Sequence, residues 1–232
     1  MELKQPKILF FDIESIGVNA LKADLGRVVC FGYKWQGQKE AHVVTMTKSE
    51  LKHFDDKPLL EKISKLYIEA ELTVAHYGSV FDRRFLQGRL LINNLPPWPM
   101  TKMRDTCMIF RSVANFSSNR LKYLCKILKL GNQKLDNNWP DAWFEVMRGN
   151  MKALKEMAIY CRGDVMALED LYNRVRPFDN AHTRMYNKGR CRVCGSDKLQ
   201  YRGFAYMGEQ KYRRYQCTSC SKWDRERKAY AD

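Results

Sequence analysis

The chain has 232 residues, a net charge of +15 and eight cysteines. This length predicts one medium domain and a small second one. The sequence contains no internal repeat, no low-complexity tract, no signal peptide and no apolar run of about 18 residues. These features exclude repeat and membrane-spanning proteins and favour the cytoplasm, without a membrane partner.

The first predicted element is a buried strand, KILFFDIESIG, that carries two acidic residues. Its run of apolar, aromatic and β-branched residues is typical of a central strand. Because strand side chains alternate, Asp12 and Glu14 project from the same face. Two adjacent carboxylates repel each other and are costly to bury, and a divalent cation such as Mg²⁺ or Mn²⁺ would turn this cost into a binding site. The alternative is a strand end that emerges into solvent.

Strands and helices follow along the next segments. The β-rich start runs to about Thr47, with a helix at 58–70 and a strand at 72–77 after it. Ser79-Val-Phe-Asp82 fits a capping box, with Asp82 as the acidic third residue of a helix. This position also suits a carboxylate that helps to hold a cation through water. A loop at 93–99 precedes helices at about 104–112, 120–130 and 151–175, with residues 136–143 as a loop or a short helix.

This order of elements predicts an α/β fold in which a mixed sheet is flanked by helices. The long helix at 151–175 carries Tyr160 and Asp164, which lie on one helical face because they are four residues apart. A phenol beside a carboxylate is an arrangement that positions a water molecule next to a metal. Each of the two residues taken alone also fits an ordinary helix surface.

Together these residues resemble a known family. Asp12-x-Glu14 on the first strand, Asp82 after an aromatic residue, and Tyr160-x-x-x-Asp164 on a late helix resemble the DEDDy branch of the ribonuclease-H-like 3′–5′ exonucleases. The resemblance runs from about residue 7 to residue 178 and includes the strand Gly26–Trp35 and the Asp105-Thr106 pair. It implies a ribonuclease-H-like fold and a stand-alone nuclease domain.

The residues just before Asp164 distinguish the two branches of this family. The sister DEDDh branch has a histidine five residues before the last Asp, where this chain has Ile159, whereas the tyrosine branch has the residue found here as Tyr160. The middle motif departs from the family, because an Asn commonly follows the His and this chain has Tyr77 after His76. The resemblance places His76, Tyr77 and Phe81 along the substrate strand and leaves the substrate preference there open.

The resemblance also implies a two-metal site. Asp12, Glu14 and Asp164 would hold one Mg²⁺ or Mn²⁺, and Asp12 would bridge to a second ion that Asp82 supports through water. Such ions lie about 3.5–4 Å apart and stabilise the attacking and leaving oxygens of an in-line phosphoryl displacement. An unperturbed phenol has a pKa of about 10, so Tyr160 is expected to orient the attacking water rather than to remove its proton.

The resemblance implies hydrolysis from a 3′ end with release of nucleoside 5′-monophosphates, and single-stranded DNA is the expected substrate. RNA is the alternative substrate. A non-hydrolytic module that binds nucleic acid or a replication partner is the alternative from another class, and the complete set of carboxylates plus the tyrosine favours the enzyme. Replication or repair proteins are candidate partners.

Two Cys-x-x-Cys pairs near the C-terminus predict a zinc ribbon. Cys191 and Cys194 are separated from Cys217 and Cys220 by 22 residues, and four thiolates fit one structural Zn²⁺ without an open position for catalysis. Two disulfides are the alternative. The other four cysteines are scattered and no signal peptide is present, so a reducing compartment and zinc are favoured.

The charge of this segment indicates contact with nucleic acid. Residues 181–232 contain 13 Lys or Arg and 5 Asp or Glu, a net charge of +8. Lys211, Arg213 and Arg214 alternate with Tyr212 and Tyr215, so that cations for phosphates lie beside rings for unpaired bases. A second group of cations, Arg225, Arg227 and Lys228, follows Trp223. The alternative is that these tyrosines face the ribbon's own core. The expected organisation is a nuclease domain at 1–178, a linker at 179–190 and a zinc ribbon at 191–232.

Overall fold

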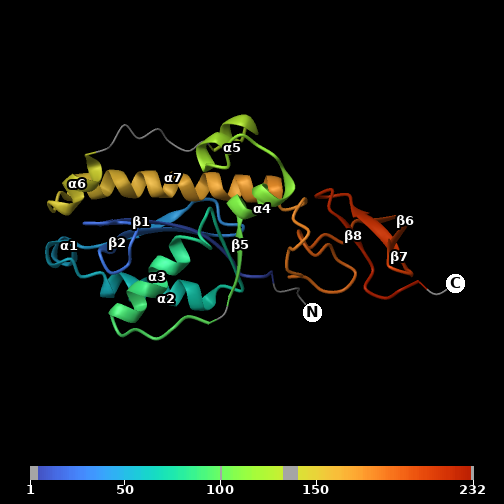
Figure 1. The fold of residues 1–232 in the computed structure, drawn as a ribbon, viewed down its shortest axis with the longest axis horizontal. Helices are drawn as coiled ribbons and strands as arrows, with labels where there is room; N and C mark the ends of the chain where they lie inside the picture. Colours follow the sequence, from blue (N-terminus) through green and yellow to red (C-terminus); the bar gives the residue numbers. More distant parts are fainter. Residues whose placement is uncertain (1–4, 100, 133–140, 231–232) are drawn as a thin grey trace. The chain divides into compact units, whose positions relative to one another are not determined.

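A five-stranded mixed sheet is the centre of the N-terminal part of the protein (Figure 1). The computed structural model describes residues 5–99, 101–132 and 141–230. These divide into two compact units, Met1–Tyr172 and Asn173–Asp232. The assignment of residues 1–178, 179–190 and 191–232 as domain, linker and ribbon stays a prediction.

The sheet of the first unit has the order β3-β2-β1-β4-β5. Its first three strands are antiparallel neighbours, and β4 and β5 extend the sheet in parallel from β1. The strands are β1 (Ile8–Gly17), β2 (Gly26–Trp35), β3 (His42–Thr45), β4 (Leu72–Ala75) and β5 (Lys102–Asp105). The helices of this unit are α1 (Lys48–His53), α2 (Lys57–Glu69), α3 (Asp82–Ile92), α4 (Thr106–Val113), α5 (Leu121–Ile127), α6 (Ala142–Met147) and α7 (Met151–Val175), of which α7 extends beyond Tyr172. The predicted α/β class with a mixed sheet flanked by helices is therefore confirmed.

Side chains of β1 alternate between two layers of helices, as the pleat of a strand requires. The ring of Phe10 lies 5.5 Å from that of Tyr172 on α7, whereas the ring of Phe11 lies 6.0 Å from that of Tyr67 on α2. Figure 1 shows α7 along one side of the sheet and α2 and α3 along the other. Phe10, Asp12 and Glu14, which precede the register shift of β1 between Glu14 and Ser15, therefore face α7.

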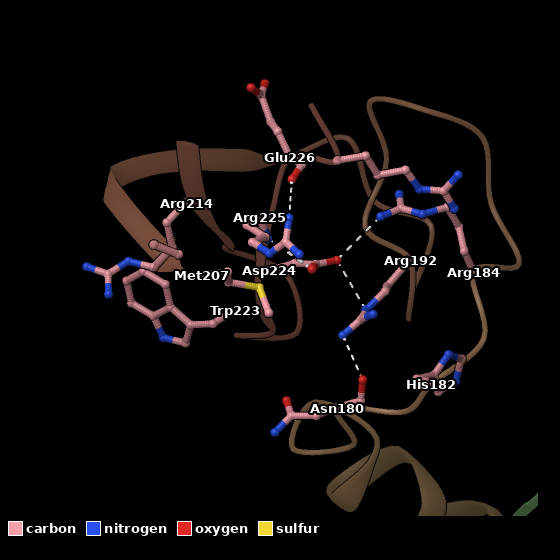
Figure 2. Close-up of a pocket in the computed structure, with 12 residues that line it drawn as sticks. Asn180, His182, Arg184, Arg192, Met207, Arg214, Trp223, Asp224, Arg225 and Glu226 are labelled. Atoms are coloured by element: carbon pink, nitrogen blue, oxygen red, sulfur yellow. Dashed lines mark hydrogen bonds and ion pairs between the residues drawn. The ribbon is translucent and has the colours of Figure 1, made fainter. Parts of the chain in front are cut away.

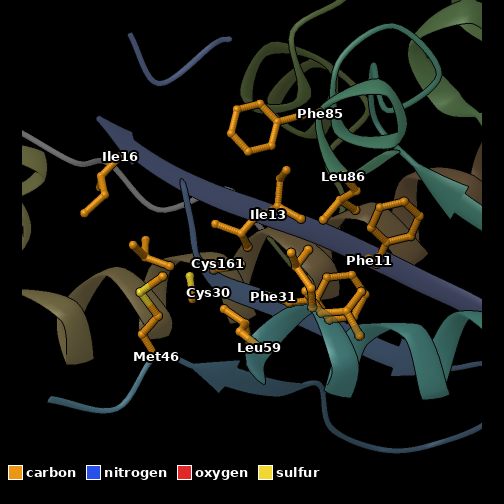
Figure 3. Close-up of a cluster of buried hydrophobic side chains, with 14 of the residues drawn as sticks. Phe11, Ile13, Ile16, Cys30, Phe31, Met46, Leu59, Phe85, Leu86 and Cys161 are labelled. Carbon is orange, nitrogen blue, oxygen red and sulfur yellow. The ribbon is translucent and has the colours of Figure 1, made fainter. Parts of the chain in front are cut away.

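A continuous apolar cluster packs against the sheet and includes residues of α2 and α3 as well as residues of α6 and α7 (Figure 3). Phe11 and Ile13 of β1 pack there with Phe85 and Leu86 of α3, and all four side chains are buried. This burial supplies the main driving force for the fold, at about 25 cal/mol per Å² of apolar surface removed from water.

A buried ion pair fixes the position of α3. Arg89 donates through Nε and Nη2 to the two carboxylate oxygens of Asp56, each at 2.8 Å, and both side chains are inaccessible or nearly so. Asp56 also accepts the backbone N–H of Val28 on β2. Because a buried charge without a partner is costly, this pair specifies where α3 lies against the sheet.

Three expectations about local structure are corrected. Residues 102–105, of which 104 and 105 were expected in a helix, form β5, whose strand character comes from pairing with β4. The short helix α1 (Lys48–His53), which was not expected, begins with a capping box at Thr47. The expected capping box at Ser79 is absent among the described contacts, because α3 begins only at Asp82 and Ser79 donates its hydroxyl to Asp105. Most of the segment 136–143 lies outside the described residues, and its last two residues, Ala142 and Trp143, open α6.

The second unit contains a three-stranded antiparallel sheet, ordered β6-β7-β8. Its strands are β6 (Leu199–Met207), β7 (Gln210–Cys217) and β8 (Trp223–Arg225). The register between β6 and β7 shifts between Tyr201 and Phe204. Across the described part of the chain, the structure offers no helix with both the length and the apolar character needed to span a membrane.

Candidate functional site

Three carboxylates meet where α7 crosses the central sheet. Each of Asp12, Glu14 and Asp164 offers an oxygen within 4.8 Å of the others. Asp164 is buried, and the two β1 residues are partly exposed. This arrangement follows from local rules, because the alternation of β1 directs Asp12 and Glu14 to α7, and α7 brings Asp164 to them. Three hard oxygen donors at this separation fit a Mg²⁺ or Mn²⁺ ion.

The fourth predicted carboxylate lies beside the same strand. Asp82 is buried at the first residue of α3, and the backbone N–H of Ile13, between Asp12 and Glu14 in the chain, hydrogen-bonds its carboxylate. Burial, together with the nearby charge of Asp105, raises the pKa of Asp82 to about 7. A cation near this group would favour its ionised form, so the position is consistent with a supporting role in metal binding. That role stays a prediction.

A glycine allows α7 to come this close to the sheet. Gly32 on β2 is the neighbour of Asp12 across the strand pair. A Cβ at this position would lie 2.8 Å from the Sγ of Cys161 and 3.0 Å from a methyl carbon of Val165, both on α7. Sequence inspection missed Gly32, although an isolated glycine inside a strand is a signal of close backbone approach.

The thiol of Cys161 lies directly beneath the acidic cluster. It contacts the backbone oxygen of Asp12 at 3.6 Å and its carboxylate at 3.8 Å. A hydrogen bond with Cys30 and full burial raise the pKa of Cys161 well above its ordinary value. The thiol therefore stays protonated and acts as a weak donor that helps to hold Asp12 in place.

Tyr160 is one helical turn before Asp164 on α7 and is partly exposed. Residues four apart share a helical face, so its phenol belongs to the side of α7 that carries the acidic cluster. The orienting role of the hydroxyl stays a prediction.

The loop after β4 is held in place by Asp105. Its carboxylate accepts hydrogen bonds from the backbone N–H groups of Tyr77 and Ser79, at 2.9 and 3.0 Å, and also caps α4. This fixes Tyr77 in the left-handed conformation, with φ of 65°, which is uncommon for a bulky residue. The ring is 40% exposed and lies 5.5 Å from the guanidinium of Arg111.

The other two residues expected along the substrate have internal contacts. His76 hydrogen-bonds Thr106 Oγ1 at 2.8 Å and the backbone oxygen of Asn119 at 2.9 Å through its two ring nitrogens. The ring of Phe81 lies 5.5 Å from that of Phe85, against the core. Contact of either residue with a substrate stays a prediction.

The second unit brings the four C-terminal cysteines together. One Sγ atom from each of Cys191, Cys194, Cys217 and Cys220 lies within 4.8 Å of the others, and two of the Sγ–Sγ pairs are 3.6 Å apart. A tetrahedral site with Zn–S bonds of about 2.3 Å has edges of about 3.8 Å, so the thiols fit one Zn²⁺. All four cysteines are free, which argues against the disulfide alternative. Without a metal, hydrogen bonds from Cys194 and then Cys220 lower the pKa of the Cys191 thiol, and the same hydrogen bonds raise the pKa values of Cys194 and Cys220. A bound Zn²⁺ would favour the thiolate form of all four cysteines.

The basic residues predicted on β7 lie beside aromatic rings, but these are not the rings expected. The buried side chains of Tyr212 and Tyr215 form the ribbon's own core, which corrects the expectation that they offer stacking faces. Lys211 lies 4.3 Å from the ring of Phe204, and Arg213 lies 5.2 Å from the ring of Tyr230. Arg214 lies 5.0 Å from the ring of Trp223.

The residues that sequence inspection missed form an exposed aromatic surface. Tyr201 is 53% exposed, Tyr206 is 71% exposed, and Phe204 and Tyr230 lie nearby over Lys211 and Arg213. We call these four rings, together with the predicted cations Lys211 and Arg213, the aromatic face. Alternation along β6 was the signal that could have identified this face, because Phe204 and Tyr206 are two residues apart. Tyr201 differs in spacing because the register shifts between Tyr201 and Phe204.

Comparisons with known proteins agree with this geometry. A family model described as the RNase_H superfamily matches residues 9–176. The structure of the family B DNA polymerase from the hyperthermophilic archaeon Pyrobaculum calidifontis is similar, with a TM-score of 0.57 and 13% sequence identity, over 75% of this chain and 26% of the polymerase. At this identity the likeness concerns the fold alone, and the chain spans about a quarter of the polymerase. A search among curated proteins gave no match.

The close packing at Gly32 generates a first prediction. Gly32→Ala places a Cβ against Cys161 and Val165, so α7 must shift, and we expect a loss of about 1–3 kcal/mol in the free energy of unfolding. The shift should also weaken Mn²⁺ binding, measured by electron paramagnetic resonance titration. Gly131→Ala is the control, because its nearest new contact is an ordinary 3.7 Å to Asp170. Equal Mn²⁺ affinity in both variants would contradict the account.

The cysteine cluster generates a second prediction. The purified chain should contain one zinc ion, measured by elemental analysis, and Cys217→Ser should lose it because three thiolates remain. Cys107→Ser is the matched control, since Cys107 is a buried thiol on α4 of the first unit. Zinc content that is the same in both variants would show that the cluster does not hold the metal.

Proposed function

Because the chain belongs to the RNase H superfamily, we propose that it is a 3′–5′ exonuclease of the DEDDy type that requires divalent metal ions. The observation that carries this proposal is the convergence of Asp12, Glu14 and Asp164 within 4.8 Å, with Asp82 hydrogen-bonded to the same strand. The proposed substrate is single-stranded DNA, and the product is a nucleoside 5′-monophosphate. The zinc ribbon of the second unit is part of the same proposal.

The carboxylates have distinct tasks in this mechanism. Asp12, Glu14 and Asp164 would hold one divalent cation, and Asp12 and Asp82 would help to hold a second. When bound, two divalent ions stabilise the attacking and leaving oxygens of an in-line phosphoryl displacement. Cys161 and the Gly32 contact keep Asp12 and α7 in register, so the ligands are preorganised before substrate arrives.

Tyr160 orients the attacking water. It is one turn from Asp164 on α7, and its hydroxyl can accept or donate a hydrogen bond. Holding the water in line with the scissile bond lowers the barrier by restricting its orientation before reaction. The phenol is a positioning group, and the proton of the attacking water passes to solvent, which reaches the partly exposed Asp12 and Glu14.

Tyr77 contacts the end of the substrate strand. Asp105 accepts the backbone N–H of Tyr77 and holds this residue in a left-handed backbone conformation, and such strained conformations are common at ligand contacts. An aromatic ring in this position stacks on a terminal base, and Arg111 beside it attracts a phosphate. This contact replaces the amide that the family commonly has at this position.

The second unit supports the choice of a nucleic acid as substrate. Its aromatic face alternates rings with Lys211 and Arg213, which suits unpaired bases and their phosphates. The similar fold in a DNA polymerase favours DNA over RNA as the first substrate to test. A module that only binds nucleic acid would not need four carboxylates around one strand, because these repel phosphates unless cations are present.

A strand-shortening assay tests this function. The chain is incubated with 5′-labelled single-stranded DNA or RNA and Mg²⁺ or Mn²⁺, and we expect a ladder that shortens from the 3′ end. Asp12→Asn should slow cleavage by roughly 10²–10³-fold, the scale of losing one preorganised electrostatic contact. Tyr160→Phe should slow it by about 10²-fold through loss of orientation.

Tyr123→Phe is the matched control, because this hydroxyl bonds Ser117 on the surface at 2.7 Å. It should cleave at the rate of the unmodified chain. Binding of both nucleic acids without any metal-dependent shortening would rule out the proposed exonuclease activity and would support a module that only binds nucleic acid. Shortening of RNA alone would reverse the choice of substrate.

A further inference from the structure

The second unit contains an open pocket at the edge of its sheet, with a volume of about 820 Å³ (Figure 2). It lies between β8, the far end of β6 and the segment 180–192. Ala205 and Met207 line it, and these residues alternate on β6 with Phe204 and Tyr206 of the aromatic face. The pocket is therefore a separate surface from the aromatic face. Of the three cations predicted on β7, Arg214 lines the pocket, whereas Lys211 and Arg213 do not.

One wall of the pocket is apolar and flat. The indole of Trp223 is 42% exposed, and the side chain of Met207 is 55% exposed. Both side chains line the pocket (Figure 2). The guanidinium of Arg214 lies 5.0 Å from the indole ring. An exposed indole beside a cation is suited to stacking on a planar heterocycle.

The rest of the lining is strongly basic. Five arginines line the pocket, against the carboxylates of Asp224 and Glu226. Glu226 accepts a hydrogen bond from Tyr201 of the aromatic face at 2.9 Å, so its charge is engaged outside the pocket. The five arginines are Arg184, Arg192, Arg214, Arg225 and Arg227.

Asp224 organises two of these arginines. Its Oδ2 lies 3.1 Å from Nε of Arg192 and 3.5 Å from Nη2 of Arg184, and it also accepts from the Tyr215 hydroxyl at 3.2 Å. Figure 2 shows this carboxylate between the two guanidinium groups. One carboxylate cannot neutralise two arginines, so the pair retains a positive charge and is held in position before an anion binds.

We propose that this pocket binds one nucleotide unit of a single strand, with the base stacked on Trp223 and the phosphate contacted by the arginines. The flat apolar wall and the arginine-rich floor lie in one cavity, and a nucleotide is the ligand that combines a planar ring with a phosphate. This inference rests on the proposed function, because the proposed occupant of the pocket is part of the nucleic acid on which the chain acts. It adds a contact distinct from the aromatic face and from Tyr77.

Fluorescence anisotropy with the full zinc-loaded chain tests this proposal. A labelled single-stranded oligothymidylate is titrated without added Mg²⁺ or Mn²⁺, so that binding is measured without cleavage. Trp223→Ala should weaken binding by about tenfold through the loss of one stacked base. Trp223→Phe, which keeps a ring, should restore most of the affinity. Both changes are made at a half-exposed side chain, and circular dichroism and zinc content confirm that each variant is folded.

Charge is tested with two neighbouring residues. Arg227→Gln removes a pocket arginine and should reduce the slope of log affinity against log salt by about 1. Lys228→Gln removes an adjacent exposed cation that does not line the pocket, and it should change the slope much less. Equal effects of the two variants would show diffuse attraction and would overturn the pocket.

A duplex of the same sequence completes the test, because its bases are already stacked. Trp223→Ala should leave duplex affinity unchanged, and an equal loss for duplex and single strand would contradict a base contact. If the chain shortens the oligonucleotide while Trp223→Ala and Arg227→Gln bind it like the unmodified chain, this inference fails and the proposed function stands. If the pocket variants lose binding but the unmodified chain shortens neither DNA nor RNA, the proposed function fails and the pocket stands.

Discussion

The main constraint on the first unit is that it must hold three carboxylates close together although they repel one another. Asp12, Glu14 and Asp164 are brought within 4.8 Å of one another by a strand and a helix that are both packed into the core. Two features outside the carboxylates maintain this arrangement. Gly32 has no side chain, so α7 can lie close to the sheet, and the thiol of Cys161 contacts Asp12. The apolar core and the buried Asp56–Arg89 pair therefore stabilise an arrangement that is electrostatically unfavourable until cations bind.

The same repulsion explains why a basic second unit is useful. An acidic cluster repels a polyanionic substrate, whereas residues 181–232 carry a net charge of +8. In the proposed function the ribbon supplies attraction through rings and cations, and the carboxylates supply chemistry once metal ions are bound. Division of these tasks between two units lets the metal site remain acidic without loss of affinity for nucleic acid.

Local patterns predicted the parts of the structure that local rules determine. Alternation places Asp12 and Glu14 on one face, and helical periodicity predicted α7 within its observed bounds of 151–175. Tertiary contacts decided the rest. Ser79 bonds Asp105, 26 residues away, instead of capping α3, and β5 is a strand because β4 pairs with it. Arg225 and Asp224 contact the buried Tyr212 and Tyr215 of β7, so the exposed rings come from β6, from Trp223 of β8 and from the C-terminal segment. Residue spacing in the sequence does not predict these tertiary partners.

Diffraction from crystals soaked in Mn²⁺ tests the central claim most directly, because anomalous scattering locates the ion. We expect a peak coordinated by Asp12, Glu14 and Asp164, at metal–oxygen distances suited to a hard cation, and no such peak in Asp12→Asn crystals under the same conditions. Full soaking without a peak between these carboxylates, or a peak that persists unchanged in Asp12→Asn, would contradict the assignment of this cluster as the metal site.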